Sequence, residues 1–309
     1  MSASEEQMVD QLRRLFATNF PVGIEIGIGD DAAVLTGINN KLVATTDMAV
    51  EDIHFKRDWS SAFQIGAKLT TANLADLFAM GAAPKYLLVA AGLPSNLEDN
   101  FIEELAKGIR SVADKFEVNV VGGDLSKSEK IVLSITALGD LAKKPVTRSG
   151  AKVGDLIFVS ALPGLSAAGF AILSRGLDRP RYVVDAHLAP KLSAPLELIN
   201  CASAMCDISD GLSVDAVNLA MASQVNLVLS KELISNAAGF SDLAELATEL
   251  KEDVFDWVLN GGEDHFFLAT VDPEKVNGLS AIKIGEVVAG DGKVMLDEDV
   301  IKKAGYQHF

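Results

Sequence analysis

Cysteine and histidine are scarce in this sequence, which has two cysteines and four histidines among 309 residues. A disulfide framework needs more than Cys201 and Cys206, and a zinc site needs more ligands close by. We interpret both cysteines as reduced thiols of the core. Chemistry that depends on thiolate or imidazole clusters is therefore disfavoured.

Basic residues are also in short supply. The 27 Lys and Arg residues face 43 Asp and Glu residues, which gives a net charge of -16. A negative field of this size repels nucleic-acid backbones and anionic lipid, so we expect neither nucleic acid nor membrane as a partner. A phosphate-bearing ligand would need added cations, and metal ions are the obvious supply.

Long apolar runs are missing as well. No uncharged apolar segment reaches the ~20 residues of a membrane helix, and the N-terminus lacks the basic region and apolar run of a signal peptide. We therefore expect a cytoplasmic protein. Hydrophobic residues nevertheless make up 49% of the chain, which is ample for the cores of two domains.

Hydrophobic periodicity predicts alternating helices and strands in both halves of the chain. In the first half we expect helices over 5–18, 62–80 and 98–115, and strands over 41–46 (ending at Asp47), 85–92, 118–121 and 130–139. In the second half we expect helices over 166–174, 191–204, 212–222, 231–249 and 251–259, and strands over 155–162, 225–230, 264–271, 281–288 and 293–296. Residues 142–154 are rich in Lys, Arg, Gly and Pro and break the pattern. The prediction is a mixed α/β (α+β) fold with two domains, 1–143 and 148–309.

Aspartates recur at the ends of apolar elements or inside them. They are Asp30, Asp47, Asp76, Asp124, Asp207 and Asp210. Asp76 shares a predicted helix face with Leu69, Asn73 and Met80, where an ionised carboxylate is costly unless it is paired or bound to metal. A salt bridge to a distant Arg or Lys is the alternative for Asp76.

The other aspartates are ambiguous one by one. Asp47 follows two threonines at a predicted strand end, a common place for ligands but also for a plain turn. Gly122, Gly123 and Asp124 allow close backbone approach to a ligand, or form a simple turn. Asp210 would cap a helix that starts near Leu212, although this leaves Asp207 unexplained.

Taken together, hard oxygen ligands from separate elements suit Mg²⁺, which prefers carboxylates, waters and substrate phosphates. The common nucleotide-binding signatures are absent from the sequence: it has no GxxxxGK[ST] loop, no GxGxxG after a strand and no protein-kinase catalytic loop. A kinase built on this sequence would use another fold.

An ordered series of motifs resembles the thiamine-monophosphate kinases, a family related to aminoimidazole ribonucleotide synthetase and selenophosphate synthetase. The motifs are GIGDDAAVL, ATTDMAVEDIHF, NLADLFAMGAAPKYLL, VGGDLSKS, TALG, RSGAKVGD, ISDGLSVD, GGED and GYQHF. They run from about residue 27 to the C-terminus. Four stretches depart from the family pattern: Leu125-Ser126-Lys127 after GGD, His265-Phe266-Phe267 after GGED, and the looser segments SAAGFAILSRG and HLAPKLS.

The resemblance implies an N-terminal domain that binds ATP and Mg²⁺ and pairs in a homodimer, and a second domain that completes the cleft for nucleotide and substrate. The implied metal ligands are Asp30, Thr45, Thr46, Asp47, Asp76, Asp124, Asp207 and Asp210. The implied ATP contacts are Gly123, Asp124, Arg148 and Ser209, and the implied contacts with thiamine monophosphate are His54, Glu263 and Tyr306. Four of these residues have a plainer alternative role. His54 could be a hydrogen-bonded histidine near a strand, and Arg148 could be a charge in the linker. Glu263 could cap a turn, and Tyr306 could cover the edge of the core.

The expected reaction is direct in-line transfer of phosphate from ATP to thiamine monophosphate, with no covalent nucleophile on the protein. Two alternatives remain open at this point. One is another ATP-using enzyme of the same superfamily, although the sequence lacks the N-terminal or C-terminal cysteine that two of its members would need. The other is a non-catalytic protein that kept the fold and binds nucleotide or metal.

Overall fold

The chain divides into two compact units, which we call the N-terminal and C-terminal units. The computed structural model describes residues 14–15, 24–26, 34–35, 40–301 and 304–305. The N-terminal unit comprises residues up to Leu77 and Ala82–Lys144, and the C-terminal unit comprises Phe78–Gly81 and residues from Pro145 onward. The division at 144/145 lies inside the segment 142–154, and the roles assigned to the two domains stay predictions. The predicted helix over 5–18 lies almost wholly outside the described residues.

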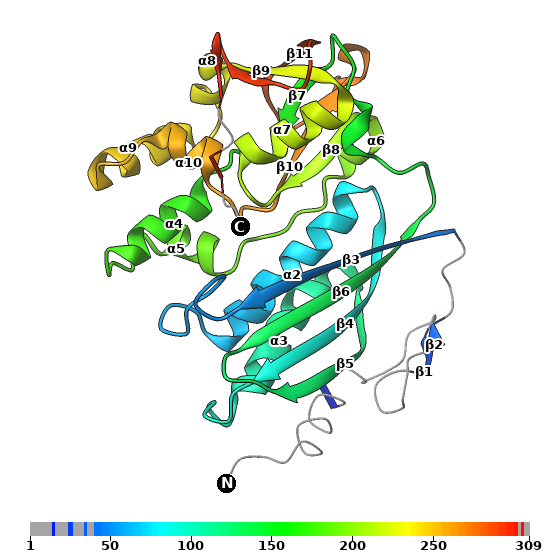
Figure 1. The fold of residues 1–309 in the computed structure, drawn as a ribbon, viewed down its shortest axis with the longest axis vertical. Coiled ribbons are helices and arrows are strands. Elements are labelled where there is room, and N and C mark those ends of the chain that lie inside the picture. The colour runs from blue at the N-terminus through cyan, green and yellow to red at the C-terminus, as the bar shows by residue number, and fades with distance from the viewer. Residues whose placement is uncertain (1–13, 16–23, 27–33, 36–39, 302–303, 306–309) are drawn as a thin grey trace. The chain divides into compact units, whose positions relative to one another are not determined.

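The N-terminal unit is a four-stranded sheet with two helices on one face (Figure 1). Its strand order is β3 (Lys41–Val50), β6 (Val132–Leu141), β4 (Ala83–Leu93) and β5 (Asn119–Lys127). The β4–β5 pair is parallel and the others are antiparallel. The helices are α2 (Ala62–Ala79) and α3 (Phe101–Ala113), followed by the turn η1 (Asp114–Phe116). A separate pair, β1 (Ile24–Ile26) and β2 (Val34–Leu35), precedes the sheet.

Alternation along the strands gives this sheet two different faces. In β6, Leu133, Ile135 and Ala137 are buried, while the intervening residues are partly exposed. The opposite face carries large apolar side chains in contact with solvent: Leu42 is 55% exposed and Met48 is 57% exposed. A folded unit rarely leaves such side chains on a flat sheet unless something else covers them.

The C-terminal unit is built on a seven-stranded sheet with the order β13-β12-β9-β11-β7-β10-β8. The strands are β7 (Leu156–Val159), β8 (Ala202–Ile208), β9 (Val225–Leu229), β10 (Phe266–Val271), β11 (Ile282–Ala289), β12 (Val294–Leu296) and β13 (Asp299–Val300). Only the β12–β9 pair is parallel among the described strands of this sheet.

Helices and short turns complete the C-terminal unit. They are η2 (Arg148–Gly150), α4 (Leu165–Ser174), α5 (Arg181–Leu188), α6 (Leu196–Cys201), α7 (Leu212–Ser223), α8 (Lys231–Ser235), α9 (Phe240–Leu250), α10 (Val254–Asn260) and η3 (Pro273–Lys275). Helix α7 packs against β8, β9, β10 and β12, and α4 packs against α5 (Figure 1). The predicted α/β class is confirmed in both units.

Several predicted element boundaries are wrong. The strand expected to end at Asp47 continues to Val50, because β3 pairs with β6 as far as Val50 opposite Val132. The predicted helix 191–204 is reduced to α6, since residues 202–208 form β8 and pair with β10. The predicted helix 231–249 is two helices, separated near Gly239 with φ +89°. Helix α5 was not predicted.

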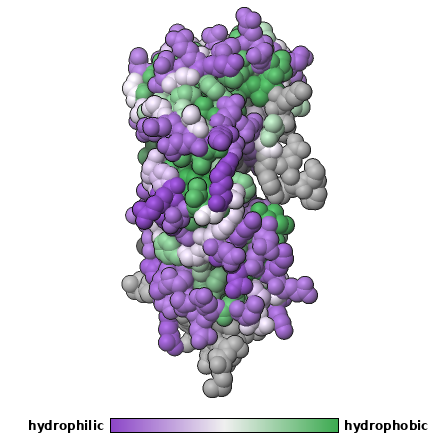
Figure 2. Space-filling model, turned by 90° about the vertical axis from the view of Figure 1, so that its left-hand side faces the viewer, coloured by the Kyte–Doolittle hydropathy of each residue, from purple (hydrophilic) through white to green (hydrophobic). Residues whose placement is uncertain are grey.

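The surface and the cysteines follow the composition. On the face shown in Figure 2, hydrophilic side chains predominate and hydrophobic areas are smaller. Cys206 is buried, whereas Cys201 is partly exposed and so is not the core thiol we expected; both are free. Among the described helices, none has the length and apolar character needed to cross a membrane.

One buried hydroxyl predicts a stabilising substitution. Thr270 in β10 is 0% exposed, and its Oγ1 has no hydrogen-bond partner within the described part of the chain. Thr270→Val removes the uncompensated hydroxyl at nearly constant volume, so we expect the free energy of unfolding to rise by about 1 kcal/mol. Urea denaturation followed by circular dichroism measures this change.

Thr70→Val is the matched control for this experiment. Thr70 is equally buried, but its Oγ1 donates to Gly66 O at 2.8 Å. Here a hydrogen bond is lost, and we expect destabilisation by about 0.5–1.5 kcal/mol. If Thr270→Val destabilises as much as Thr70→Val, the hydroxyl of Thr270 is satisfied and the prediction is wrong.

Candidate active site

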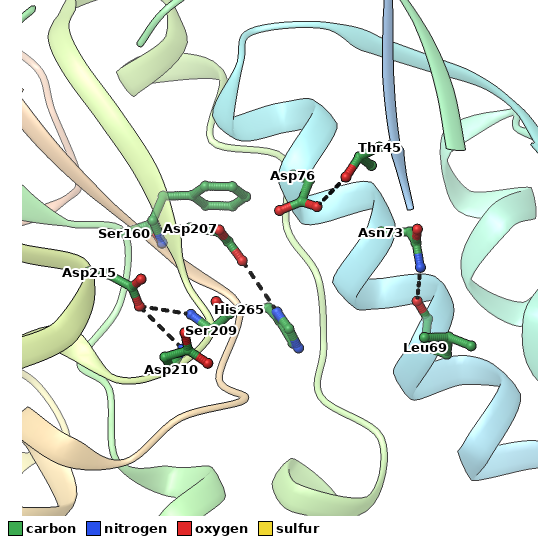
Figure 3. A network of polar contacts seen from close by, with 11 residues as sticks. Thr45, Leu69, Asn73, Asp76, Ser160, Asp207, Ser209, Asp210, Asp215 and His265 are labelled. Carbon is green, nitrogen blue, oxygen red and sulfur yellow. Dashed lines mark hydrogen bonds and ion pairs between the residues drawn. The ribbon is translucent and has the colours of Figure 1, made fainter. Parts of the chain in front are cut away.

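Two hydrogen bonds join β3 to α2 in the N-terminal unit, and Figure 3 shows the one between Thr45 and Asp76. Thr45 Oγ1 donates to Asp76 Oδ2 at 2.6 Å, and Asp47 N donates to Asn73 Oδ1 at 3.2 Å. Thr45 and Asp47 share one face of β3, because they are two residues apart, and Asn73 and Asp76 share one face of α2. Asp76 is only partly buried. Three of the predicted metal ligands therefore face the same strand–helix junction.

Two other predicted ligands of this unit are not brought to that junction. Thr46 Oγ1 donates to Ile135 O at 3.0 Å on the opposite face of β3. Asp124 lies opposite Ala90 in β4, which lies opposite Ser134 in β6, so by strand alternation Asp124 also belongs to the face of Thr46. The roles of the Thr46 and Asp124 side chains rest on the resemblance alone.

Gly123 has a packing reason to be glycine. It lies within β5, so the simple turn considered as one alternative for the GGD sequence is not formed, and an added Cβ would lie 1.9 Å from Val89 O. The parallel neighbour therefore leaves no room for a side chain. This requirement is independent of any nucleotide contact at Gly123.

The predicted substrate contact His54 lies in the turn after β3. Its Nδ1 accepts a hydrogen bond from Val50 N at 3.1 Å, so a neutral ring carries its proton on Nε2. This is the plainer alternative considered for His54. Asp30 and Tyr306 lie outside the described residues.

Carboxylates crowd the end of β8 in the C-terminal unit (Figure 3). Asp207 is 3% exposed and Asp215, in the first turn of α7, is 2% exposed. Asp215 Oδ2 accepts hydrogen bonds from Ser209 N at 3.1 Å and Asp210 N at 3.3 Å. The N-cap of α7 is Gly211, without a side-chain cap bond, so Asp210 does not cap the helix.

Asp215 was missed by sequence reasoning, although it closes the motif ISDGLSVD. An acidic residue in the first turn of a helix is usually explained by the helix dipole alone. Here its carboxylate instead holds the turn that presents Ser209 and Asp210.

The charges in this cluster act on one another. Burial, followed by the neighbouring Asp207 and Asp210, raises the pKa of Asp215 to about 7, although its two backbone hydrogen bonds lower it. Partial burial alone would lower the pKa of Arg148, but Cys206, Asp207 and Asp215 outweigh it and raise that pKa. His265 Nδ1 lies 3.5 Å from Asp207 Oδ2. The structure thus brings together Arg148, Ser209, Asp207 and Asp210, four of the predicted site residues.

The GGED loop lies against the same strand end. Glu263 N donates to Ser209 O at 2.7 Å and His265 N donates to Ile208 O at 3.1 Å. Both loop residues have positive φ, +66° at Glu263 and +52° at His265. A predicted substrate contact, Glu263, is therefore adjacent to a predicted ATP contact, Ser209.

Asp264, between these two residues, has a structural role that sequence reasoning missed. It is 3% exposed, and its carboxylate accepts from Gly164 N at 2.8 Å and Ser166 N at 3.0 Å, which are at the start of α4. Burial raises the pKa of Asp264 to about 6, against the lowering effect of the two hydrogen bonds. No local signal reveals this contact, because its partners lie about 100 residues away.

The donor chemistry fits Mg²⁺. Burial, and after it the neighbouring carboxylates of Asp207 and Asp210, raise the pKa of Asp215, so a divalent cation beside them would stabilise their ionised forms. Within the described residues no three His, Cys, Asp or Glu side chains converge into a group that could hold a metal ion by themselves. Mg²⁺ usually takes one or two protein carboxylates and completes its shell with waters and substrate phosphates, which is compatible with this arrangement.

Comparison with known proteins agrees with the fold and the motifs. Residues 29–141 match the family model for the N-terminal domain of AIR synthase related proteins. The thiamine-monophosphate kinase of Mycobacterium tuberculosis (strain CDC 1551 / Oshkosh) is 36% identical over 312 residues, covering 99% of this chain and 91% of that protein.

Solved structures agree over the whole chain. The thiamine-monophosphate kinase from Stenotrophomonas maltophilia K279a aligns with a TM-score of 0.83 and 29% identity, covering 97% of this chain and 99% of that one. A structure described as AaThiL complexed with AMPPCP and TMP aligns with a TM-score of 0.81 and 31% identity, covering 99% and 97%.

The fold, the two acidic groups and the N-terminal match define a chain of the AIR synthase related class. Within that class the near-complete alignment is more specific. The chain belongs to the thiamine-monophosphate kinase family.

The buried carboxyl of Asp264 makes a prediction about stability and pH. Asp264→Ala leaves two N–H groups of α4 without their acceptor, and we expect it to lower the free energy of unfolding at pH 7 by about 1–3 kcal/mol. Because the folded pKa of about 6 lies above the ordinary 3.8, the folded protein binds more protons between these values. The stability linked to this proton is complete below pH 3.8 and is lost as the pH rises through 6.

Urea denaturation at several pH values between 4 and 7 tests both parts. Wild-type stability should contain a component that falls over this range, and Asp264→Ala should remove it. Asp253→Ala, which removes an acceptor for Phe255 N at the exposed start of α10, controls for the loss of a helix cap. Equal pH dependence in wild type and Asp264→Ala would contradict the assignment.

Proposed function

We propose that this chain transfers the γ-phosphate of ATP to thiamine monophosphate and forms thiamine diphosphate and ADP, in the cytoplasm. The observation that carries the proposal is the contact between Glu263 N and Ser209 O at 2.7 Å. It puts the residue assigned to the thiamine substrate beside the residue assigned to ATP. The related structure with AMPPCP, an ATP analogue, and TMP supports the same pair of substrates.

Phosphoryl transfer requires positioning and charge neutralisation more than covalent help. Arg148 supplies a permanent positive charge, since the surrounding acidic groups raise its pKa. The phosphate of the acceptor has a second pKa of about 6, so its attacking oxygen is largely ionised at pH 7 and no strong general base is needed. The partly exposed Glu263 carboxylate can form an ion pair with the cationic part of thiamine or accept a hydrogen bond from its amino group.

The same residues would hold Mg²⁺ in two groups. Asp47, Asp76 and Thr45 form one group, and Asp207 and Asp210 form the other; Asp30, Thr46 and Asp124 are added by the resemblance. When bound, Mg²⁺ neutralises the phosphates and stabilises the charge that develops during transfer. Asp215 keeps the Ser209–Asp210 turn in place through its two backbone hydrogen bonds.

We further propose that two copies pair through the helix-free face of the N-terminal sheet. Leu42, Met48 and Leu88 are 55%, 57% and 37% exposed there. Thr46 Oγ1 lies 3.3 Å from Ser134 Oγ and 3.2 Å from Thr136 Oγ1, so these three hydroxyl groups satisfy one another. A flat sheet face with large exposed apolar side chains suits a second copy of the same surface.

Turnover by the purified protein tests the function directly. With ATP, Mg²⁺ and thiamine monophosphate we expect thiamine diphosphate by chromatography. We expect Asp47→Asn to lower kcat by at least about 100-fold, because it removes the charge of a proposed metal ligand from the β3–α2 junction. Asp114→Asn, in an exposed ion pair with Arg110, is the matched control and should keep wild-type activity.

Two outcomes would contradict the proposal. Absence of thiamine diphosphate with wild-type protein would remove the assigned substrate. Full activity of Asp47→Asn would remove the assigned role of the β3–α2 junction. Unfolding of Asp47→Asn is checked by its circular dichroism spectrum.

The sheet face predicts the oligomeric state. The wild-type chain of 32.7 kDa should sediment as a dimer, and Met48→Lys with Leu88→Lys should sediment as a monomer, because two buried charges per copy would be uncompensated. Leu177→Lys, at an exposed leucine of the C-terminal unit, is the control and should stay dimeric. If wild type and the double variant have the same mass, this face is not the interface.

A further inference from the structure

His187 is a buried histidine that lies beside the half-exposed carboxylate of Glu263. It belongs to the last turn of α5, and its side chain is 10% exposed whereas that of Glu263 is 36% exposed. His187 Nδ1 lies 3.6 Å from Glu263 Oε2 and 3.2 Å from Ser166 Oγ. Ser166 and His187 begin the two segments that match the family pattern loosely, SAAGFAILSRG and HLAPKLS, and neither residue was assigned a role from the sequence.

These contacts form a closed series of residues that starts and ends in the GGED loop. Ser166 N donates to Asp264 Oδ1 at 3.0 Å, Ser166 Oγ meets His187 Nδ1, and His187 meets the carboxylate of Glu263, the neighbour of Asp264. Ser166 is 1% exposed and Asp264 is 3% exposed, so this series of contacts lies in the interior of the unit. Only the Glu263 carboxylate reaches solvent substantially.

The helix pair is built to keep His187 in this place. An alanine Cβ at Gly169 of α4 would lie 2.8 Å from His187 Cβ and 2.5 Å from Val183 O, so glycine is required for α5 to approach α4. The Phe170 ring makes an edge-type contact with the imidazole, with centroids 5.7 Å apart and an interplanar angle of 66°. These packing contacts restrict the orientation of the imidazole.

The Glu263 backbone is restricted too, but its side chain needs a separate support. The left-handed backbone and the bond to Ser209 O set the direction of Cβ, while three side-chain torsions remain. An interaction of the carboxylate with a packed imidazole selects one of the resulting rotamers before the ligand arrives.

We propose that His187 is a positioning residue: through Nδ1 it holds the Glu263 carboxylate in the orientation that meets the organic part of thiamine monophosphate. The proposal rests on the proposed function and adds a determinant of acceptor specificity to it. His187 itself does not touch the substrate. Its effect is therefore confined to acceptor binding and passes through Glu263.

Steady-state kinetics of two His187 variants test this role. His187→Phe keeps the ring and its packing but removes Nδ1, and we expect KM for thiamine monophosphate to rise about tenfold while KM for ATP changes less than about twofold. His187→Asn retains a polar atom near the position of Nδ1 and should recover most of the acceptor affinity. Asp185→Asn, on the exposed side of α5, is the matched control and should behave as wild type.

A double-mutant cycle separates positioning from packing. In a Glu263→Ala background, His187→Phe should cause no further rise in the KM for thiamine monophosphate. Additive effects, or equal rises in the KM values for both substrates, would overturn the proposal. Poor rescue by His187→Asn would also count against it.

A measurement without turnover keeps this proposal distinguishable from the function it rests on. The chain has four histidines, so the imidazole signals of His187 can be assigned by ¹H–¹⁵N NMR. Glu263→Gln should shift the His187 signals and leave those of His54 unchanged. If wild type does not phosphorylate thiamine monophosphate, the proposed function fails; if His187 does not respond to Glu263→Gln, the positioning contact fails.

Discussion

The burial of several neighbouring carboxylates is the constraint on which the site depends. Asp207 and Asp215 are almost fully buried within one strand–helix connection, and Asp210 lies between them in the chain. Burial of uncompensated carboxylates costs several kcal/mol each. The fold offsets part of this cost with backbone N–H groups and Arg148, while burial still raises the pKa of Asp215. Divalent cations and their phosphates complete the compensation in our account.

The backbone around this cluster has unusual conformations and close contacts. Gly211 has φ +116°, and Glu263 and His265 adopt left-handed conformations that non-glycine residues rarely occupy. An added Cβ at Gly262 would lie 2.4 Å from Ser209 O, so the GGED loop can lie against the end of β8 only with glycine there. Close backbone contact brings Ser209 and Glu263 together, and the buried Asp264 ties the loop to α4.

Periodicity and apolar content located most elements to within a few residues. Helix α2 and strands β4 and β6 lie within two residues of their predicted bounds. Strand β8 was missed because its buried residues, Met205 and Cys206 among them, do not alternate, and a fully buried strand cannot be told from a buried helix by periodicity. Helix α5, with eight residues, is too short for a clear period.

The site was predictable as a set of aspartates but not as a geometry. Asp76 and Asp47 were identified, yet their partners Thr45 and Asn73 follow from the packing of α2 on β3. The face of Asp124 depends on a bulge: the β4–β5 register shifts between Leu87 and Leu88, and the extra residue, Val121, moves the residues after it to the opposite face. Asp215, Asp264 and His187 act through backbone groups or through other side chains, and no residue pattern predicts such contacts.

Nucleotide binding with and without divalent cation tests the central claim most directly. Isothermal titration calorimetry of wild-type protein with AMPPCP should show an affinity at least about 100-fold higher in Mg²⁺ than in EDTA, a difference of about 2.7 kcal/mol. The acidic group around Asp207 would repel the uncompensated triphosphate analogue. Equal affinity in the two conditions would contradict the account, because nucleotide binding beside the carboxylates would then not depend on a divalent cation.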